Sequence, residues 1–143
     1  MRFIAHLDQL SKALTFVKDF AREKVARKKV ARKKLDQLEL ALEEAIVNVI
    51  SYAYPSKGGI PENPRYFELA CDFLSPDSFS VTLTDSGIPF DPTKNPLPEV
   101  SKIPLEKRGI GGLGLVLIRN RVNILTYRRE GVKNILTMQM KLS

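Results

Sequence analysis

Apolar residues in the N-terminal part of the chain follow two helical patterns. In the first, they recur at steps of three and four residues, at Leu7, Leu10, Leu14 and Val17. In the second, similar steps join Leu35, Leu38, Leu42, Ala45 and Val49. These patterns predict amphipathic helices over about 7–24 and 35–54, and the segment 2–5 fits a short edge strand.

Apolar residues further along the chain alternate with polar or small ones, which is typical of strands with one buried face. One alternating run contains Phe67, Leu69, Cys71 and Phe73, and the next contains Phe79, Val81 and Leu83. A turn at 75–77 would join them into a hairpin. A last hairpin is predicted over 124–129 and 132–142, and four of its residues should face the core: Leu136, Met138, Met140 and Leu142.

Between the two hairpins, residues 85–108 show no sustained period and contain Pro89, Pro92, Pro96, Pro98 and Pro104. A loop of this length in a compact domain is usually functional, as in a lid, or else disordered. Residues 109–114 are rich in glycine and lead into a short helix at about 115–122. The order of elements predicts a single domain over 1–143 with an α+β fold, in which helices cover one face of a largely antiparallel sheet.

The composition narrows the class of protein. Of the 143 residues, 43% are hydrophobic, so one core can form without disulfides or a structural metal. Cys71 is the only cysteine, which excludes an intrachain disulfide and fits a reducing compartment. There is no signal-peptide pattern and no apolar run near the roughly 18 residues of a membrane span. We therefore expect a soluble, cytoplasmic protein without a membrane partner.

The net charge of +7 favours an anionic partner. Much of the excess lies in 22–34, where the sequence VARKK occurs twice in tandem. This segment is either a solvated, partly helical connector or a patch for nucleic acid or membrane. It lacks the interleaved aromatic residues of single-strand binders, so direct nucleic-acid binding is not expected.

Glu44 and Asn48 lie one turn apart on the second predicted helix, about 40° apart around its axis. The apolar stripe centres near Ala45 and Val49, so both polar side chains lie at the rim of the core. Asn is a poor residue for a helix interior. A carboxylate and an amide oxygen so placed can share a hydrated Mg²⁺, although a boundary Asn satisfied by nearby backbone gives the same pattern.

Two further motifs suit a nucleotide. Asp85 follows a strand directly in TDSGIPFDP, residues 84–92, and Gly87 permits a tight backbone turn. A carboxylate at this place suits the exocyclic amine of a purine, although an ordinary Asp-Ser-Gly turn looks alike. In RGIGGLGLVLIRN, residues 108–120, glycines before an apolar helix offer N–H groups to phosphates. The spacing is neither that of a P-loop nor that of a Rossmann turn.

The three motifs, in this order, resemble the N, G1 and G2 boxes of the GHKL ATPase superfamily, which has the Bergerat, or histidine kinase-like ATPase, fold. The strongest stretches are LELALEEAIVNV, DSGIPFD and GGLGLVLI. The short form, without a second domain, is similar to the anti-sigma factor serine kinases. The resemblance covers nearly the whole chain and implies a two-layer sandwich.

The resemblance also implies roles for the motif residues. Glu44 would be the general base toward a serine hydroxyl of the protein substrate, and Asn48 would ligate Mg²⁺. Asp85 would accept a hydrogen bond from the adenine amine of ATP, with Gly87 alongside. The backbone amides of Gly111, Gly112 and Gly114 would bind the phosphates, and residues 91–108 would close as the ATP lid. Arg108, at the end of this lid, would contact either phosphate or the partner protein, or would be an ordinary surface cation.

The family implies partners as well. An anti-sigma factor of this kind sequesters a sigma factor, phosphorylates an anti-anti-sigma antagonist of the STAS type and forms a homodimer through its N-terminal helix and strand. Two alternatives stay open: a nucleotide-gated binding clamp that transfers no phosphate, and a basic nucleic-acid module centred on 22–34. Glu44 favours the kinase, because a clamp could tolerate its loss.

Two stretches depart from the family's pattern. Tyr52-Ala53-Tyr54 stands where members often have His-Ala-Tyr or His-Gly-Tyr. The final strand often opens with Gly-Thr, but here Gly131 leads to Val132 and Thr137 comes later. The hydroxyl expected on the adenine side is therefore unassigned.

Overall fold

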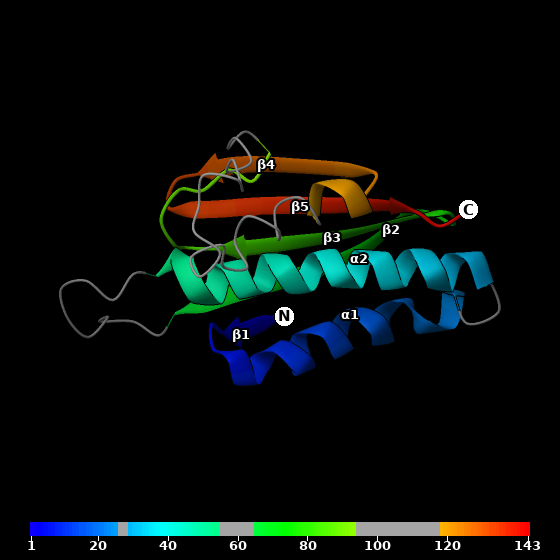
Figure 1. Cartoon of the computed structure of the whole chain (residues 1–143), viewed down its shortest axis with the longest axis horizontal. Coiled ribbons are helices and arrows are strands. Elements are labelled where there is room, and N and C mark those ends of the chain that lie inside the picture. Colours follow the sequence, from blue (N-terminus) through cyan, green and yellow to red (C-terminus); the bar gives the residue numbers. More distant parts are fainter. Residues whose placement is uncertain (26–28, 55–64, 94–117) are drawn as a thin grey trace, which may run out of the picture.

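Two long helices pack on one face of a sheet in the computed structural model of the chain, which describes residues 1–25, 29–54, 65–93 and 118–143 (Figure 1). The helices are α1 (Leu10–Val25) and α2 (Lys29–Asn48). A 3₁₀ turn at Leu7–Gln9 leads into α1, and a π-helical turn at Val49–Ala53 follows α2. Residues 118–121 are also helical.

The sheet has five strands within the described residues: β1 (Arg2–Ile4), β2 (Tyr66–Ser75), β3 (Ser78–Asp85), β4 (Ile124–Glu130) and β5 (Lys133–Lys141). Their order is β1-β2-β3-β5-β4, and each neighbouring pair is antiparallel. β5 therefore lies between β3 and β4, so its start is beside the end of β3 (Figure 1). The predicted α+β fold, with helices on one face of an antiparallel sheet, is confirmed.

The second helix begins earlier than its apolar pattern predicted. α2 starts at Lys29 rather than near 35, because Ala31 and Leu35 extend its buried stripe toward the N-terminus. Lys and Arg also have high helix propensity. In its described residues, the basic segment 22–34 is thus the end of α1 and the first turns of α2.

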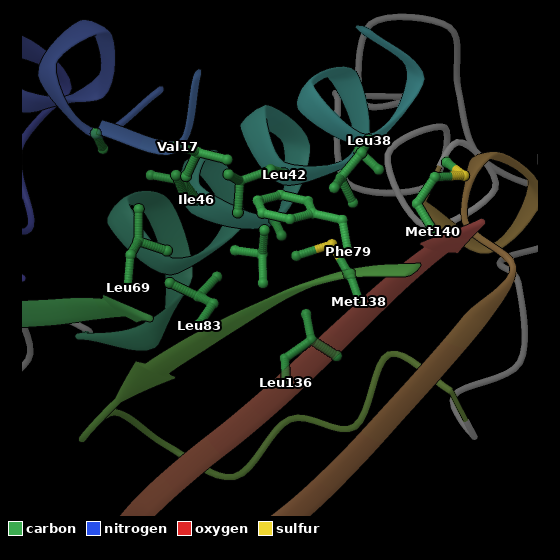
Figure 2. Close-up of a cluster of buried hydrophobic side chains, with 14 of the residues drawn as sticks. Val17, Leu38, Leu42, Ile46, Leu69, Phe79, Leu83, Leu136, Met138 and Met140 are labelled. Carbon is green, nitrogen blue, oxygen red and sulfur yellow. The ribbon is translucent and has the colours of Figure 1, made fainter. Parts of the chain in front are cut away.

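The space between the sheet and the helices is filled by one hydrophobic core (Figure 2). Leu38, Leu42 and Ile46 line the inner face of α2, and Figure 2 shows Phe79 of β3 beside Leu42. The residues predicted to face the core from the last strand are buried: Leu136, Met138, Met140 and Leu142. Burying one such aliphatic side chain contributes about 1.5–3 kcal/mol, so this layer holds the helices to the sheet.

Two expectations from composition can be compared with the structure. Cys71 in β2 is partly buried, and burial raises the pKa of its thiol to about 11, so the thiol stays protonated at neutral pH. Within the described part of the chain, no helix combines the length and hydropathy needed to cross a membrane.

Candidate nucleotide-binding site

A cavity of about 270 Å³ lies between the end of α2, the sheet and the loop that follows β3. Its wall is mostly apolar and includes Ala45, Val49, Leu83, Ile88, Phe90 and Leu136. Among the described residues of this wall, few side chains are polar: Asn48, Tyr52, Asp85, Tyr127 and Asn134. A concave apolar site with a few placed polar groups is typical of small-molecule binding.

Asn48 in the cavity wall and Glu44, one turn earlier on α2, carry two buried oxygen atoms that have no partner within the described residues. Glu44 Oε2 and Asn48 Oδ1 are buried, and within the described residues neither accepts a hydrogen bond. Both come from α2, one turn apart, and Asn48 is part of the cavity wall. Leaving a buried acceptor unpaired costs about 1–3 kcal/mol, so native proteins keep few of them. Such a pair is suited to a ligand that supplies the partners which these two acceptor oxygens lack.

The environment of Glu44 makes its carboxylate a better proton acceptor than an exposed glutamate. Burial raises the pKa of the Glu44 carboxyl, and the nearby charge of Glu43 raises it further. A catalytic base works best when its pKa approaches the working pH. The shift is therefore in the direction that general-base catalysis requires.

The same oxygen atoms fit a magnesium ion that is held mainly by a nucleotide. Mg²⁺ prefers oxygen ligands and usually keeps waters and substrate phosphates around one or two protein ligands. Among the described residues, no group of three or more His, Cys, Asp or Glu could hold a metal without a nucleotide. Asn48 Oδ1 is suited to be the single protein ligand of the ion. The Glu44 carboxylate is suited to accept a hydrogen bond from a water or hydroxyl group beside it.

Asp85 is one of the polar residues that the sheet contributes to the cavity wall. It ends β3 and is 7% exposed. Its Oδ1 accepts hydrogen bonds from the backbone N–H of Gly87 at 2.8 Å and from Nδ2 of Asn134 at 3.0 Å. The carboxylate is thus held by the loop on one side and by β5 on the other.

Gly87 is required by close packing rather than by an unusual backbone angle. A Cβ at this position would overlap the carbonyl oxygen of Ala53 and lie 2.7 Å from its carbonyl carbon. The backbone N–H of Ile88 donates to the same oxygen at 2.9 Å. Among the described glycines only Gly131 has a positive φ, so the special backbone turn predicted at Gly87 was the wrong physical reason for a glycine there.

Tyr54 joins the end of α2 to the loop that carries Asp85. Its hydroxyl donates to the carbonyl oxygen of Tyr66 at 2.5 Å and accepts from the N–H of Ser86 at 3.0 Å. Arg65 Nη1 in turn donates to the carbonyl oxygen of Tyr54 at 2.8 Å. The Tyr-Ala-Tyr stretch thus has a structural task here, because it holds the turn after β3 against the helix.

Asn134 is the site residue that sequence reasoning missed. Asn134 is the second residue of β5, and its side chain donates a hydrogen bond to Asp85 near the start of the final strand, where the family often has a Gly-Thr pair. Thr137, the later threonine, bonds Thr82 instead, at 3.3 Å between the hydroxyl oxygens. The signal available in the sequence was the predicted hairpin, which puts 134 near the start of a strand.

Several predicted phosphate-binding residues cannot be placed against the cavity. Most of the lid lies in 94–117, outside the described residues, together with Arg108, Gly111, Gly112 and Gly114. The described start of the lid is tied to the helical residues 118–121, since Arg119 Nε donates to the carbonyl oxygen of Pro92 at 2.7 Å.

Comparison with known proteins defines the class. The sequence pattern of the histidine kinase-like ATPase domain matches residues 3–140. The chain therefore belongs to this family. The histidine kinase AdeS of Acinetobacter baumannii shares the fold, with a TM-score of 0.50 and 13% identity over 100% of this chain and 68% of that chain.

Curated relatives narrow the class further. The serine-protein kinase RsbW of Staphylococcus aureus (strain MRSA252) is 28% identical over 111 residues, 75% of this chain and 67% of that protein. The anti-sigma F factor of Clostridium acetobutylicum is 22% identical over 144 residues, 99% of this chain and 93% of the relative. The serine/threonine-protein kinase BtrW of Bordetella bronchiseptica is 30% identical over 101 residues, 71% of this chain and 66% of that protein. The resemblance to the anti-sigma factor kinases is confirmed, and the chain stands among the protein serine/threonine kinases of the family.

Proposed function

We propose that this chain is a cytoplasmic anti-sigma factor with ATP-dependent protein serine kinase activity. It phosphorylates a serine of a STAS-type anti-anti-sigma antagonist and sequesters a sigma factor. One observation carries the proposal: Glu44 Oε2 and Asn48 Oδ1, one turn apart on α2, are buried and have no partner within the described residues, and Asn48 lies in the wall of an apolar cavity that also includes Asp85. The names of the relatives support the same function.

The cavity residues divide the work on ATP. The adenine ring lies among the apolar side chains, and its amine donates to Asp85. Asn48 Oδ1 ligates Mg²⁺, which when bound neutralises charge on the phosphates. The amides of Gly111, Gly112 and Gly114, with Arg108 and the lid, complete the phosphate site.

Glu44 acts on the protein substrate. As the serine Oγ forms a bond to the γ-phosphorus, the bond from that phosphorus to the bridging oxygen breaks and ADP leaves. The serine proton passes to the Glu44 carboxylate. Positioning and charge neutralisation supply most of the rate, and the base adds about 10²–10⁴-fold.

The test is Glu44→Gln, which keeps the shape of the side chain and removes the base. With Mg²⁺, γ-labelled ATP and a native extract, the wild type should label a small protein on serine. The variant should lose at least about 100-fold of this transfer while its ATP affinity changes little. Glu39→Gln, more than one turn earlier on α2 and paired with Lys18, is the matched control and should keep transfer.

Two results would replace this proposal. Undiminished transfer by Glu44→Gln would remove the assigned base. Tight ATP binding by a wild type that transfers nothing would identify the nucleotide-gated clamp instead.

The basic segment offers a second candidate, a nucleic-acid surface. Arg22, Lys29 and Arg32 line one groove between α1 and α2. The same groove contains Asp19 and Asp36, whose carboxylates would repel a phosphate backbone. We therefore expect no salt-dependent shift of DNA or RNA by the wild type; a shift abolished by neutralising Lys28, Lys29, Lys33 and Lys34 would favour the nucleic-acid function.

The homodimer is part of the same proposal. Met1, Ile4 and Leu7 are apolar and exposed in and beside β1, at an edge of the sheet. An edge strand with exposed apolar residues is suited to pairing with a second copy. Light scattering that gives the mass of one chain at micromolar concentration would contradict it.

A further inference from the structure

The side-chain amide of Asn134 has every hydrogen-bonding position occupied. It is 6% exposed and lies opposite Asp85 in the ladder between β3 and β5. Nδ2 donates to Asp85 Oδ1 at 3.0 Å and to the carbonyl oxygen of Ile88 at 2.8 Å. Oδ1 accepts from the hydroxyl of Tyr127 at 2.6 Å and from Nη1 of Arg129 at 3.1 Å. An amide has two donors and two acceptor positions, so none is left over.

These four bonds allow only one orientation of the amide. A flip would turn its oxygen toward Asp85 and Ile88, which both present acceptors, and its nitrogen toward the donor Arg129. Arg129 Nη1 also donates to the carbonyl oxygen of Gly87 at 2.8 Å, so β4 holds both Asn134 and the loop after β3. The amide therefore always presents a donor to Asp85.

The fixed amide determines which part of Asp85 is available to a ligand. Oδ1 already accepts from Gly87 and Asn134, and within the described residues the structure gives no donor to Oδ2. Asp85 is part of the cavity wall. Oδ2 is thus the acceptor that remains for a ligand in the cavity.

We infer that Asn134 is a positioning residue that makes the cavity selective for 6-amino over 6-oxo purines by holding Asp85 in a single orientation. This inference rests on the proposed function, in which the cavity binds a purine nucleotide. An ionised carboxylate only accepts hydrogen bonds, so it pairs with a 6-amino group and opposes a 6-oxo oxygen. Sites built to pair one polar group discriminate strongly against a ligand that leaves it unpaired.

Asn134→Asp tests this inference with almost no change of shape. The new carboxylate can still accept from Tyr127 and Arg129, but it cannot donate to Asp85. Calorimetry with Mg²⁺ and either ATP or ITP compares two nucleotides that differ at the 6-position of the ring. We expect the wild type to bind ATP at least about 30-fold more tightly than ITP, and Asn134→Asp to reduce this ratio to about fivefold or less.

Two further variants separate positioning from a structural effect. Tyr127→Phe removes one of the two bonds to the amide oxygen, so its ATP/ITP ratio should fall between those of the wild type and Asn134→Asp. Thr137→Val removes a hydroxyl from the same strand, where it bonds Thr82 rather than the site, and should keep the wild-type ratio. Circular dichroism and thermal unfolding show which variants are folded, and Tyr127→Phe decides the test if Asn134→Asp is not.

The outcomes distinguish this inference from the function on which it rests. A wild-type preference for ATP that falls in folded Asn134→Asp supports the inference. A ratio that is unchanged in folded Asn134→Asp, or a wild type that binds ATP and ITP equally, overturns the inference and leaves the kinase proposal standing. A folded wild type that binds neither nucleotide overturns the proposed function and this inference with it.

Discussion

At the scale of residues, the candidate site depends on polar atoms whose surroundings differ sharply. Glu44 Oε2 and Asn48 Oδ1 are buried without partners within the described residues, whereas Asn134 has four. Unpaired buried atoms are costly, so they indicate where a ligand binds. Polar groups whose hydrogen-bonding positions are all occupied are held rigidly, and they indicate which residues fix the geometry of the site.

Glu44 should make stability depend on pH. Because burial raises the pKa of its carboxyl above that of the unfolded chain, ionisation opposes folding. The wild type should therefore lose stability as the pH rises from the ordinary glutamate value, about 4.3, through the raised folded value. Glu44→Gln removes this loss, so urea unfolding should show the variant gaining on the wild type from pH 4 to pH 7.5.

Glu68→Gln is the control, because the contribution of Glu68 to stability should change with pH in the opposite direction. The hydrogen bond from Arg2 lowers the pKa of the Glu68 carboxyl, so its contribution is present above the ordinary value and lost as the pH falls. A Glu44→Gln variant that becomes less stable relative to the wild type as the pH rises would contradict the predicted direction.

Gly87→Ala should destabilise the fold and weaken nucleotide binding. The added Cβ would overlap backbone atoms of Ala53, which cannot rotate away as a side chain could. Overpacking of this kind costs about 1–3 kcal/mol, measurable by urea denaturation. Gly131→Asn is the control, because its φ of 58° suits Asn and no atom lies within 4 Å of the added Cβ. Equal stability of Gly87→Ala and the wild type would show that the loop can shift freely.

At the scale of elements, α2 contributes both to the hydrophobic core and to the cavity wall. Its inner face packs on the sheet through Leu38, Leu42 and Ile46, and its last turn carries Asn48 into the cavity wall. The π-helical turn at Val49–Ala53 then places Ala53 against the loop after β3. Because one helix supplies both contacts, its packing sets the distance from Asn48 to the sheet.

Leu42→Ala should lower the free energy of unfolding by about 2–5 kcal/mol, since its side chain is 0% exposed and its loss leaves a cavity in the core. Leu40→Ala, on the same helix, is the matched control. Its side chain is 46% exposed, so the change should stay within about 0.5 kcal/mol. Chemical denaturation measures both, and similar losses for the two variants would mean that α2 is packed differently from the structure.

At the scale of the whole molecule, the strand order brings distant segments to one site. β5 lies between β3 and β4, so Asp85, Asn134 and Arg129 lie side by side across three strands. α2 covers the same end of the sheet and closes the cavity (Figure 1). A ligand held by α2 and these strands should therefore stabilise the entire fold rather than one loop.

Mg-ATP should raise the unfolding midpoint of the whole chain in a single transition. At a ligand concentration about 100 times the Kd, the gain is about 2.7 kcal/mol. Asn48→Ala should remove most of the part that depends on Mg²⁺, which scanning calorimetry with and without Mg²⁺ would show. An Asn48→Ala variant whose Mg²⁺-dependent gain equals that of the wild type would contradict the metal role of Asn48.

Local patterns in the sequence determined which segments form elements and which faces are buried. Steps of three and four residues predicted both helices, and strict alternation predicted the hairpins with their inward residues from Leu136 to Leu142. The order of the three motifs also led to the family. These features depend on side chains close together in the chain, and hydrophobic periodicity reports them directly.

Only the tertiary structure decided which residues meet. Asp85 and Asn134 are 49 positions apart, and they bond because β5 returns beside β3 in a particular register. The close approach that requires Gly87 likewise arises between elements, as does the lack of partners for Glu44 Oε2 and Asn48 Oδ1 among the described residues. Strand order and register are set by non-local pairing and packing of the whole sheet, which no local pattern encodes.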